Sequence, residues 1–102
     1  MITLKNETKG AYYNAIKDIL KKYPGYTAQI LSYGDMVCEY SIATNSEKGI
    51  IPTKLDGDMI YIGDYAERIG FCYKNITFLE FNEEEGLQVY FKNDSHLSLI
   101  FI

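Results

Sequence analysis

The last thirty residues restrict the fold most, because they hold three strand-like segments separated by polar turns. The segments span residues 76–81, 87–91 and 97–102, and the turns span residues 82–86 and 92–95. In the last two segments apolar residues alternate with period two, at Leu87/Val89/Phe91 and Leu97/Leu99/Phe101. Such alternation gives a strand one apolar face. We therefore predict a three-strand antiparallel meander whose apolar face another element must cover.

An amphipathic helix over residues 8–23 is the element suited to cover that face. Its apolar residues recur at the spacing of one helical face, namely Tyr12, Ala15, Ile16, Ile19, Leu20 and Tyr23. Lys17 and Lys21 fall on the opposite side, where we expect them to meet solvent. Pro24 and Gly25 then end the helix.

Between the helix and the meander, the chain has the composition of further strands. We predict strands over residues 26–33, 36–44, 50–55 and 59–62, the last two joined by the hairpin signal Asp56-Gly57. Residues 64–70 fit a short helical turn and a loop equally well. The sequence thus predicts a single α+β domain over residues 1–102. Its N-terminal amphipathic helix packs on a largely antiparallel sheet of six or seven strands.

The charge distribution favours a basic protein as the partner. Ten Lys and Arg residues against fourteen Asp and Glu residues give a net charge of −4. Residues 1–30 hold five lysines and two acids, so the negative charge belongs to the remainder of the chain. A domain that binds duplex nucleic acid carries a basic stripe, which is missing here. We expect no direct binding of nucleic acid, and an acidic surface that steers a basic protein towards it.

Sequence signals for export, membranes and metals are missing as well. The chain starts without the apolar segment of a secretion signal, and no apolar run approaches the ~20 residues that cross a bilayer. We therefore expect a cytoplasmic protein with no membrane partner. Cys38 and Cys72 lie among apolar residues, and His96 is the one histidine. These residues do not make a metal-ligand set, so we expect reduced thiols and no cofactor.

Motifs of common enzymes are also missing. The chain has no glycine-rich phosphate loop, no H-E-x-x-H and no G-x-S-x-G. Asp56-Gly57-Asp58 lacks the remaining ligands of a calcium loop, and a hairpin turn explains it better. We expect a protein that is not an enzyme, and an enzyme with an unrecognised site is held as a third hypothesis.

Five acidic residues in two turns are the candidate partner-binding residues. They are Asp56, Asp58, Glu83, Glu84 and Glu85. If the strand at 76–81 starts at the end of the sheet where the strand at 59–62 stops, both turns share one rim, opposite the 92–95 turn. Carboxylates on one rim repel each other, and a cationic partner relieves that repulsion. The sequence thus predicts an acidic rim that binds a cationic protein site.

The general character of the chain resembles a known class of inhibitors. The chain is small and acidic, has ten tyrosines without tryptophan, and favours amino acids with A/T-rich codons. In these respects it resembles bacterial immunity proteins that neutralise nuclease toxins, and phage-encoded inhibitors of host defence have the same character. The resemblance implies binding and inhibition of a toxin or host-defence protein. The other hypothesis is a small-ligand module with a tyrosine-lined pocket between helix and sheet.

Overall fold

The computed structural model describes residues 2–23, 28–33, 39–42, 51–63, 68–92 and 94–101, with the backbone alone for 28–33 and 39–42. The parts of the predicted strands at 26–27, 36–38, 43–44 and 50 lie outside these residues. The described elements are β1 (Ile2–Lys5), α1 (Lys9–Lys21), β2 (Ala28–Tyr33), β3 (Glu39–Ile42), β4 (Thr53–Asp56), β5 (Met59–Ile62), β6 (Ile69–Cys72), the 3-10 helix η1 (Tyr73–Asn75), β7 (Ile76–Asn82), β8 (Gly86–Phe91) and β9 (His96–Phe101).

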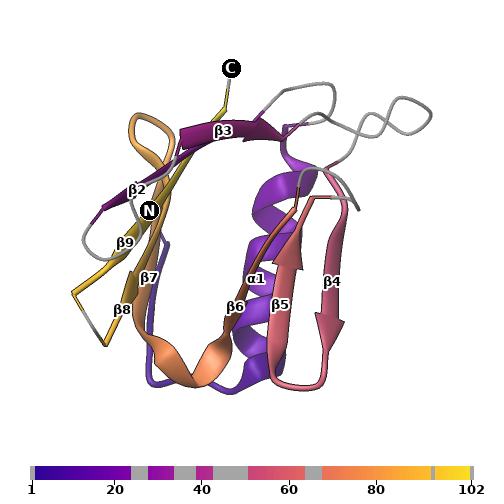
Figure 1. Ribbon diagram of the computed structural model, residues 1–102, viewed down its shortest axis with the longest axis vertical. Coiled ribbons are helices and arrows are strands. Elements are labelled where there is room, and N and C mark those ends of the chain that lie inside the picture. The colour runs from indigo at the N-terminus through magenta and orange to yellow at the C-terminus, as the bar shows by residue number, and fades with distance from the viewer. Residues whose placement is uncertain are drawn as a thin grey trace.

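The strands form two antiparallel sheets, which confirms the α+β class. The six-stranded sheet has the order β1-β7-β8-β9-β2-β3, and the three-stranded sheet has the order β4-β5-β6. Figure 1 shows the six-stranded sheet on the left, the three-stranded sheet on the right in front of α1, and η1 joining them at the bottom. The predicted meander is present as β7-β8-β9.

Two strands add to those that the sequence predicts. β1 precedes α1 and pairs with β7, so it extends the meander by one edge strand. β6 occupies the end of the segment that fitted a turn or a loop. It contains Gly70, which is uncommon inside strands because it offers no side chain to pack. Here the ring of Tyr61 lies so close that a Cβ at Gly70 would clash with it, and Arg68 covers that ring at 4.4 Å.

The helix α1 forms where its pattern predicts. Thr8 caps its N-terminus, because the Thr8 hydroxyl accepts a hydrogen bond of 3.2 Å from the Ala11 amide. The predicted apolar face is buried at Tyr12, Ile16, Ile19 and Leu20, while Lys17 and Lys21 are exposed. Among the described residues, no helix has the length and apolar character that a bilayer crossing requires.

One hydrophobic core joins α1 to both sheets. Its fully buried members include Ile16 and Leu20 of α1, Ile60 of β5, and Leu79 and Leu97 of the meander. The end of α1 is fixed to the six-stranded sheet, since the ring of Tyr23 stacks on Phe101 at 4.2 Å and meets Phe81 edge-on at 6.1 Å. One face of that sheet is therefore used by the core, and the other faces away from it.

Truncation of the helix core should destabilise the protein strongly. Ile16→Ala and Leu20→Ala remove side chains that are 0% and 1% exposed, so each should lower the free energy of unfolding by about 2–5 kcal/mol. The exposed Lys21→Ala is the matched control and should change it by less than about 0.5 kcal/mol. Urea denaturation measures all three variants. Losses below about 1 kcal/mol at both apolar positions would contradict the packing.

Two turn glycines should differ in their sensitivity to alanine. Gly57 and Gly86 have φ of +61° and +80°, where an L-residue costs about 1–2 kcal/mol. A Cβ at Gly57 has nothing within 4 Å, whereas at Gly86 it meets the main-chain carbonyl of Leu99. Urea denaturation should therefore show that Gly86→Ala lowers the free energy of unfolding more than Gly57→Ala does, by at least about 1 kcal/mol. Equal losses would show that the Gly86 contact carries no cost.

Candidate functional site

A bulge in β7 lets Ile76 join the core although Phe78, two residues later, lies on the outside of the six-stranded sheet. The pairing of β7 with β8 shifts register between Ile76 and Phe78, which leaves Thr77 as an extra residue. Without the shift, residues two apart would share a face. Instead Ile76 and Leu79 are buried in the core at 5% and 0% exposure, and Phe78 is partly exposed. The Thr77 hydroxyl donates to the Tyr90 carbonyl oxygen at 3.1 Å and holds the bulge.

Four neighbouring side chains form a ladder across β1, β7, β8 and β9. Lys5, Phe78, Tyr90 and His96 are opposite one another in the strand register. The ring centroids of Phe78 and Tyr90 lie 4.1 Å apart with 15° between their planes, and those of Tyr90 and His96 lie 4.2 Å apart with 12°. The Lys5 Nζ lies 5.7 Å from the Phe78 centroid. The three rings are half-buried and cover one another's faces, so their edges form a row of partly exposed aromatic surface.

A polar row lies beside the ladder on the same face. Gln88 Nε2 donates to Ser98 Oγ at 2.9 Å and to the Glu85 carbonyl at 2.7 Å. Gln88 Oε1 therefore faces His96 Nε2, at 2.5 Å, and His96 must donate from that nitrogen. Gln88 and Ser98 are each 6% exposed, which makes this network a fixed support for the ladder. We name as the outer face the residues Thr3, Lys5, Phe78, Glu80, Gln88, Tyr90, His96 and Ser98.

The pKa shifts on the outer face follow from burial and from Glu80. Burial lowers the pKa of His96 below 6.5, and the nearby Glu80 carboxylate opposes that shift. Burial also raises the pKa of Tyr90, and Glu80, which accepts a 3.5 Å hydrogen bond from the Tyr90 hydroxyl, raises it further. At neutral pH both rings are therefore uncharged, and the outer face carries charge at Lys5 and Glu80.

The acidic turn, Glu83, Glu84 and Glu85, continues directly from the outer face. All three side chains are exposed, and the turn is closed by Asn82 Oδ1, which accepts from the Glu85 amide at 2.7 Å. Gln88 binds the Glu85 carbonyl, so the support of the ladder also anchors the turn. A groove of about 550 Å³ runs beside the turn, and the Lys22 side chain lines it with Phe81 below.

The structure separates the two acidic turns, so the prediction that they share one rim of the sheet is wrong. The Asp58 carbonyl accepts from the Tyr73 amide at 2.9 Å, which places the turn with Asp56 and Asp58 beside η1, where β7 starts. The acidic turn lies at the other end of the seven-residue β7, roughly 20 Å away at 3.3 Å per residue (Figure 1). The cause is β6, because one more strand reverses the direction of every later strand.

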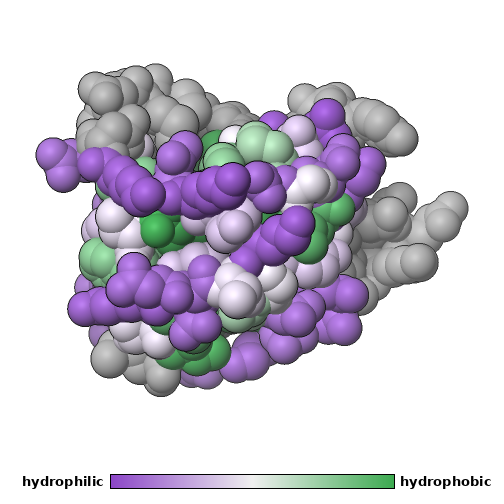
Figure 2. Space-filling model, turned by 90° about the horizontal axis from the view of Figure 1, so that it is seen from below, coloured by the Kyte–Doolittle hydropathy of each residue, from purple (hydrophilic) through white to green (hydrophobic). Residues whose placement is uncertain are grey.

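The end with Asp58 has its own charge balance. The Asp58 carboxylate contacts Lys74 at 3.1 Å and Lys9 at 3.8 Å. The Lys92 amide donates to the Asn75 carbonyl at 2.9 Å, so the turn at 92–95 lies at this end too, although it was predicted opposite Asp56 and Asp58. Figure 2 views the molecule from this end, and its surface is largely hydrophilic with small hydrophobic areas between.

The residues of the ladder were not singled out by the sequence. The alternation that buries Val89 and Leu97 also assigns Tyr90 and His96 to the opposite face, so this signal was available. Phe78 alternates with the buried Leu79 and Phe81, so the same signal applies to it, whereas Ile76 could not be assigned because the bulge that returns it to the core leaves no clear mark in the sequence. In the described part of the chain, no group of three or more potential metal ligands is present.

The titration of His96 tests the environment of the ladder. Because the pKa in the folded state lies below 6.5, the unfolded chain takes up its proton first as the pH falls. The free energy of unfolding should thus decrease as the pH falls below about 6.5, until folded His96 protonates as well. NMR of this one histidine should give a midpoint below 6.5, and His96→Gln should remove this part of the pH dependence. A midpoint at or above 6.5 would contradict the burial.

Comparisons with known proteins add no assignment to this geometry. Neither the protein-family models, nor the curated proteins, nor the solved structures that were searched include a match to the chain. The candidate function therefore depends on the chemistry of the outer face and the acidic turn.

Proposed function

We propose that the protein binds and inhibits another protein, and that it docks on a basic surface of that partner through the outer face and the acidic turn. The observation that carries the proposal is the stacked ladder of Phe78, Tyr90 and His96 on the side of the sheet away from the core. In this proposal the protein binds its partner without catalysing a reaction, and the binding needs no cofactor.

The ladder has the properties of the centre of a protein interface. Aromatic residues, tyrosine above all, are enriched among residues that contribute most to binding, because they bury a large area with few rotatable bonds. Stacking fixes the ring of Tyr90 between Phe78 and His96, and Gln88 fixes His96. Little side-chain entropy is then lost when a partner covers these rings. Lys5 and Glu80 provide a polar margin.

The charge beside the ladder selects the class of partner. Glu80 accepts a hydrogen bond from Tyr90 and the charge of Glu85 also acts on that ring, while Glu83 and Glu84 follow in the same turn. A nuclease presents lysines and arginines to the phosphates of its substrate, so its active surface complements this region. We therefore propose a nuclease-like toxin as the target, which would make the protein an immunity-type inhibitor. A host-defence nuclease inhibited by a phage protein has the same surface chemistry and is the alternative target.

The test pairs the protein with the product of the gene next to its own. That product should cleave plasmid DNA, and a stoichiometric amount of this protein should stop the cleavage. Tyr90→Ala should raise Kd by roughly thirtyfold or more, as expected of a central residue that contributes about 2 kcal/mol. Tyr73→Ala, at η1, is the matched control and should bind normally. Equal affinities for the two variants would refute the docking face.

Replacement of Glu83, Glu84 and Glu85 by Gln should slow the association instead. Exposed charges act mainly on the encounter, so k_on should fall about tenfold at low salt and depend less on ionic strength. Glu7→Gln, Asp18→Asn and Asp94→Asn together remove the same charge from exposed positions elsewhere and should have a smaller effect. Stopped-flow binding at several salt concentrations measures both triple variants. The same k_on for both would show that the acidic turn does not steer the partner.

A further inference from the structure

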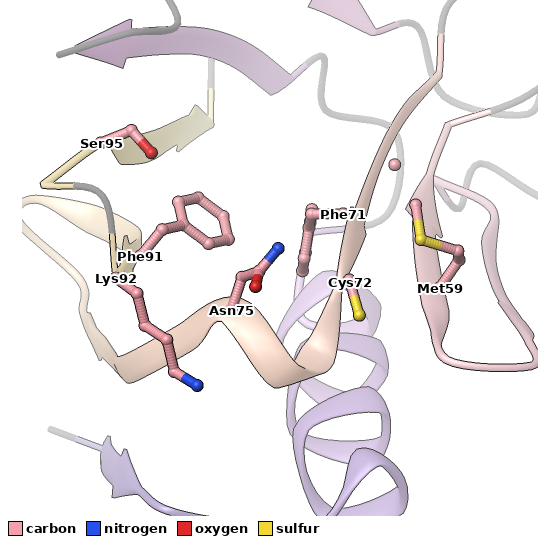
Figure 3. Close-up of a pocket in the computed structure, with 8 residues that line it drawn as sticks. Met59, Phe71, Cys72, Asn75, Phe91, Lys92 and Ser95 are labelled. Carbon is pink, nitrogen blue, oxygen red and sulfur yellow. The ribbon is translucent and has the colours of Figure 1, made fainter.

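A cleft separates the free edge of β6 from the turn between β8 and β9. β6 is the edge strand of the three-stranded sheet, and it pairs with β5 alone among the described strands. The cleft has a volume of about 500 Å³, within the range of ligand sites. It lies between the two sheets, whereas the outer face lies on the far side of the six-stranded sheet (Figures 1 and 3). Its lining comprises Met59, Gly70, Phe71, Cys72, Asn75, Phe91, Lys92 and Ser95.

The main chain of β6 presents unused hydrogen-bonding groups to this cleft. The Tyr73 amide donates to the Asp58 carbonyl, so these opposite residues are a hydrogen-bonded pair. Pairs in an antiparallel ladder alternate, so Phe71 and Ile69 also bond to β5, whereas the N–H and C=O of Gly70 and Cys72 point to the free edge. Within the described residues, no hydrogen bond reaches the N–H and C=O of Gly70 or the N–H of Cys72, whereas the Cys72 carbonyl accepts the first bond of η1.

The floor and the rim of the cleft differ in chemistry. The rings of Phe71 and Phe91 meet edge-to-face at 5.5 Å across the floor, and each residue is 7% exposed (Figure 3). The exposed Lys92 and the amide of Asn75 stand at the rim. Lys74 and Lys9 belong to the same end of the molecule, where they share the Asp58 carboxylate. Lys92 is therefore the cation that the cleft itself offers to an anionic group, with the exposed Asp94 in the same turn.

We propose that the cleft takes up an extended segment of a partner protein, which pairs with β6 as an additional strand. Its main chain bonds to Gly70 and to the N–H of Cys72, one apolar side chain covers Phe71 and Phe91, and an acidic side chain meets Lys92. Unpaired main-chain groups on an edge strand are a template for such an addition, and an adjacent apolar floor gives side-chain selectivity. This interaction uses a surface apart from the outer face, so it stands independently of the proposed inhibition.

A proline at Cys72 tests the strand pairing selectively. Cys72 has φ −81° and ψ 129°, which proline adopts, and its N–H faces the cleft rather than β5. Cys72→Pro therefore removes one pairing group and leaves the ladder with β5 intact. Cys72→Ala is the matched control, because it removes the thiol and keeps the N–H. Both variants should unfold at nearly the temperature of the natural chain.

The probe is an acetylated hexapeptide of alternating valine and threonine that ends in glutamate. It should bind the natural chain and Cys72→Ala saturably, shift the Gly70 amide resonance and slow its hydrogen exchange, and bind Cys72→Pro at least tenfold more weakly. A second peptide has glutamine in place of the glutamate and an amidated C-terminus, so that it carries no negative charge. It should bind the natural chain more weakly than the first peptide, and the two peptides should bind a Lys92→Gln variant with nearly equal affinity.

Several outcomes would overturn the proposal. Equal binding to the proline and alanine variants would mean that the peptide does not pair with β6. If Cys72→Pro failed to fold, unchanged exchange of the Gly70 amide in the natural chain at saturating peptide would refute the pairing by itself. Protection of that amide by concentration-dependent dimerisation would show that a second copy, and not a foreign segment, occupies the edge. None of these results tests the proposed inhibition, which the variants of the outer face and the acidic turn test separately in the nuclease and binding assays.

Discussion

The bulge at Thr77 is the constraint on which the two faces of the six-stranded sheet depend. It allows one strand to contribute Ile76 and Leu79 to the core and Phe78 to the opposite side. Without it, the unbroken pairing from Phe78 onward would keep Phe78 beside Tyr90, and Ile76 would leave the core for the same side as Phe78. A single extra residue thus separates the surface that stabilises the fold from the surface that we propose for binding.

The parts of the fold that depend on local pattern were predictable, and those that depend on strand count were not. The face of α1 with Ile16 and Leu20 follows from helical spacing, and the meander follows from alternation. β6 was missed because Gly70 suggests a loop, although the ring of Tyr61 fills the space that its missing side chain leaves. Every later strand direction depends on β6, so the separation of Asp58 from Glu83 could not be foreseen either.

The two proposed binding surfaces use different physics. The ladder and the acidic turn rely on side chains that are already held by stacking and hydrogen bonds, so they suit a rigid, folded partner. The cleft beside β6 offers main-chain groups and an apolar floor at Phe71, so it suits a segment that becomes ordered only when it binds. A partner with a folded basic site and a flexible acidic extension could occupy both surfaces at once.

The ion pairs of Asp58 with Lys9 and Lys74 have a consequence for the molecule as a whole. They cancel an acidic charge at the end that also carries Lys92, while at the opposite end the carboxylates of the acidic turn outnumber Lys22, which lines the same groove. The described part of the chain is therefore an electric dipole whose negative pole lies at the acidic turn. In the field of a cationic surface such a dipole experiences a torque, so the molecule turns its acidic pole towards that surface before any contact is made.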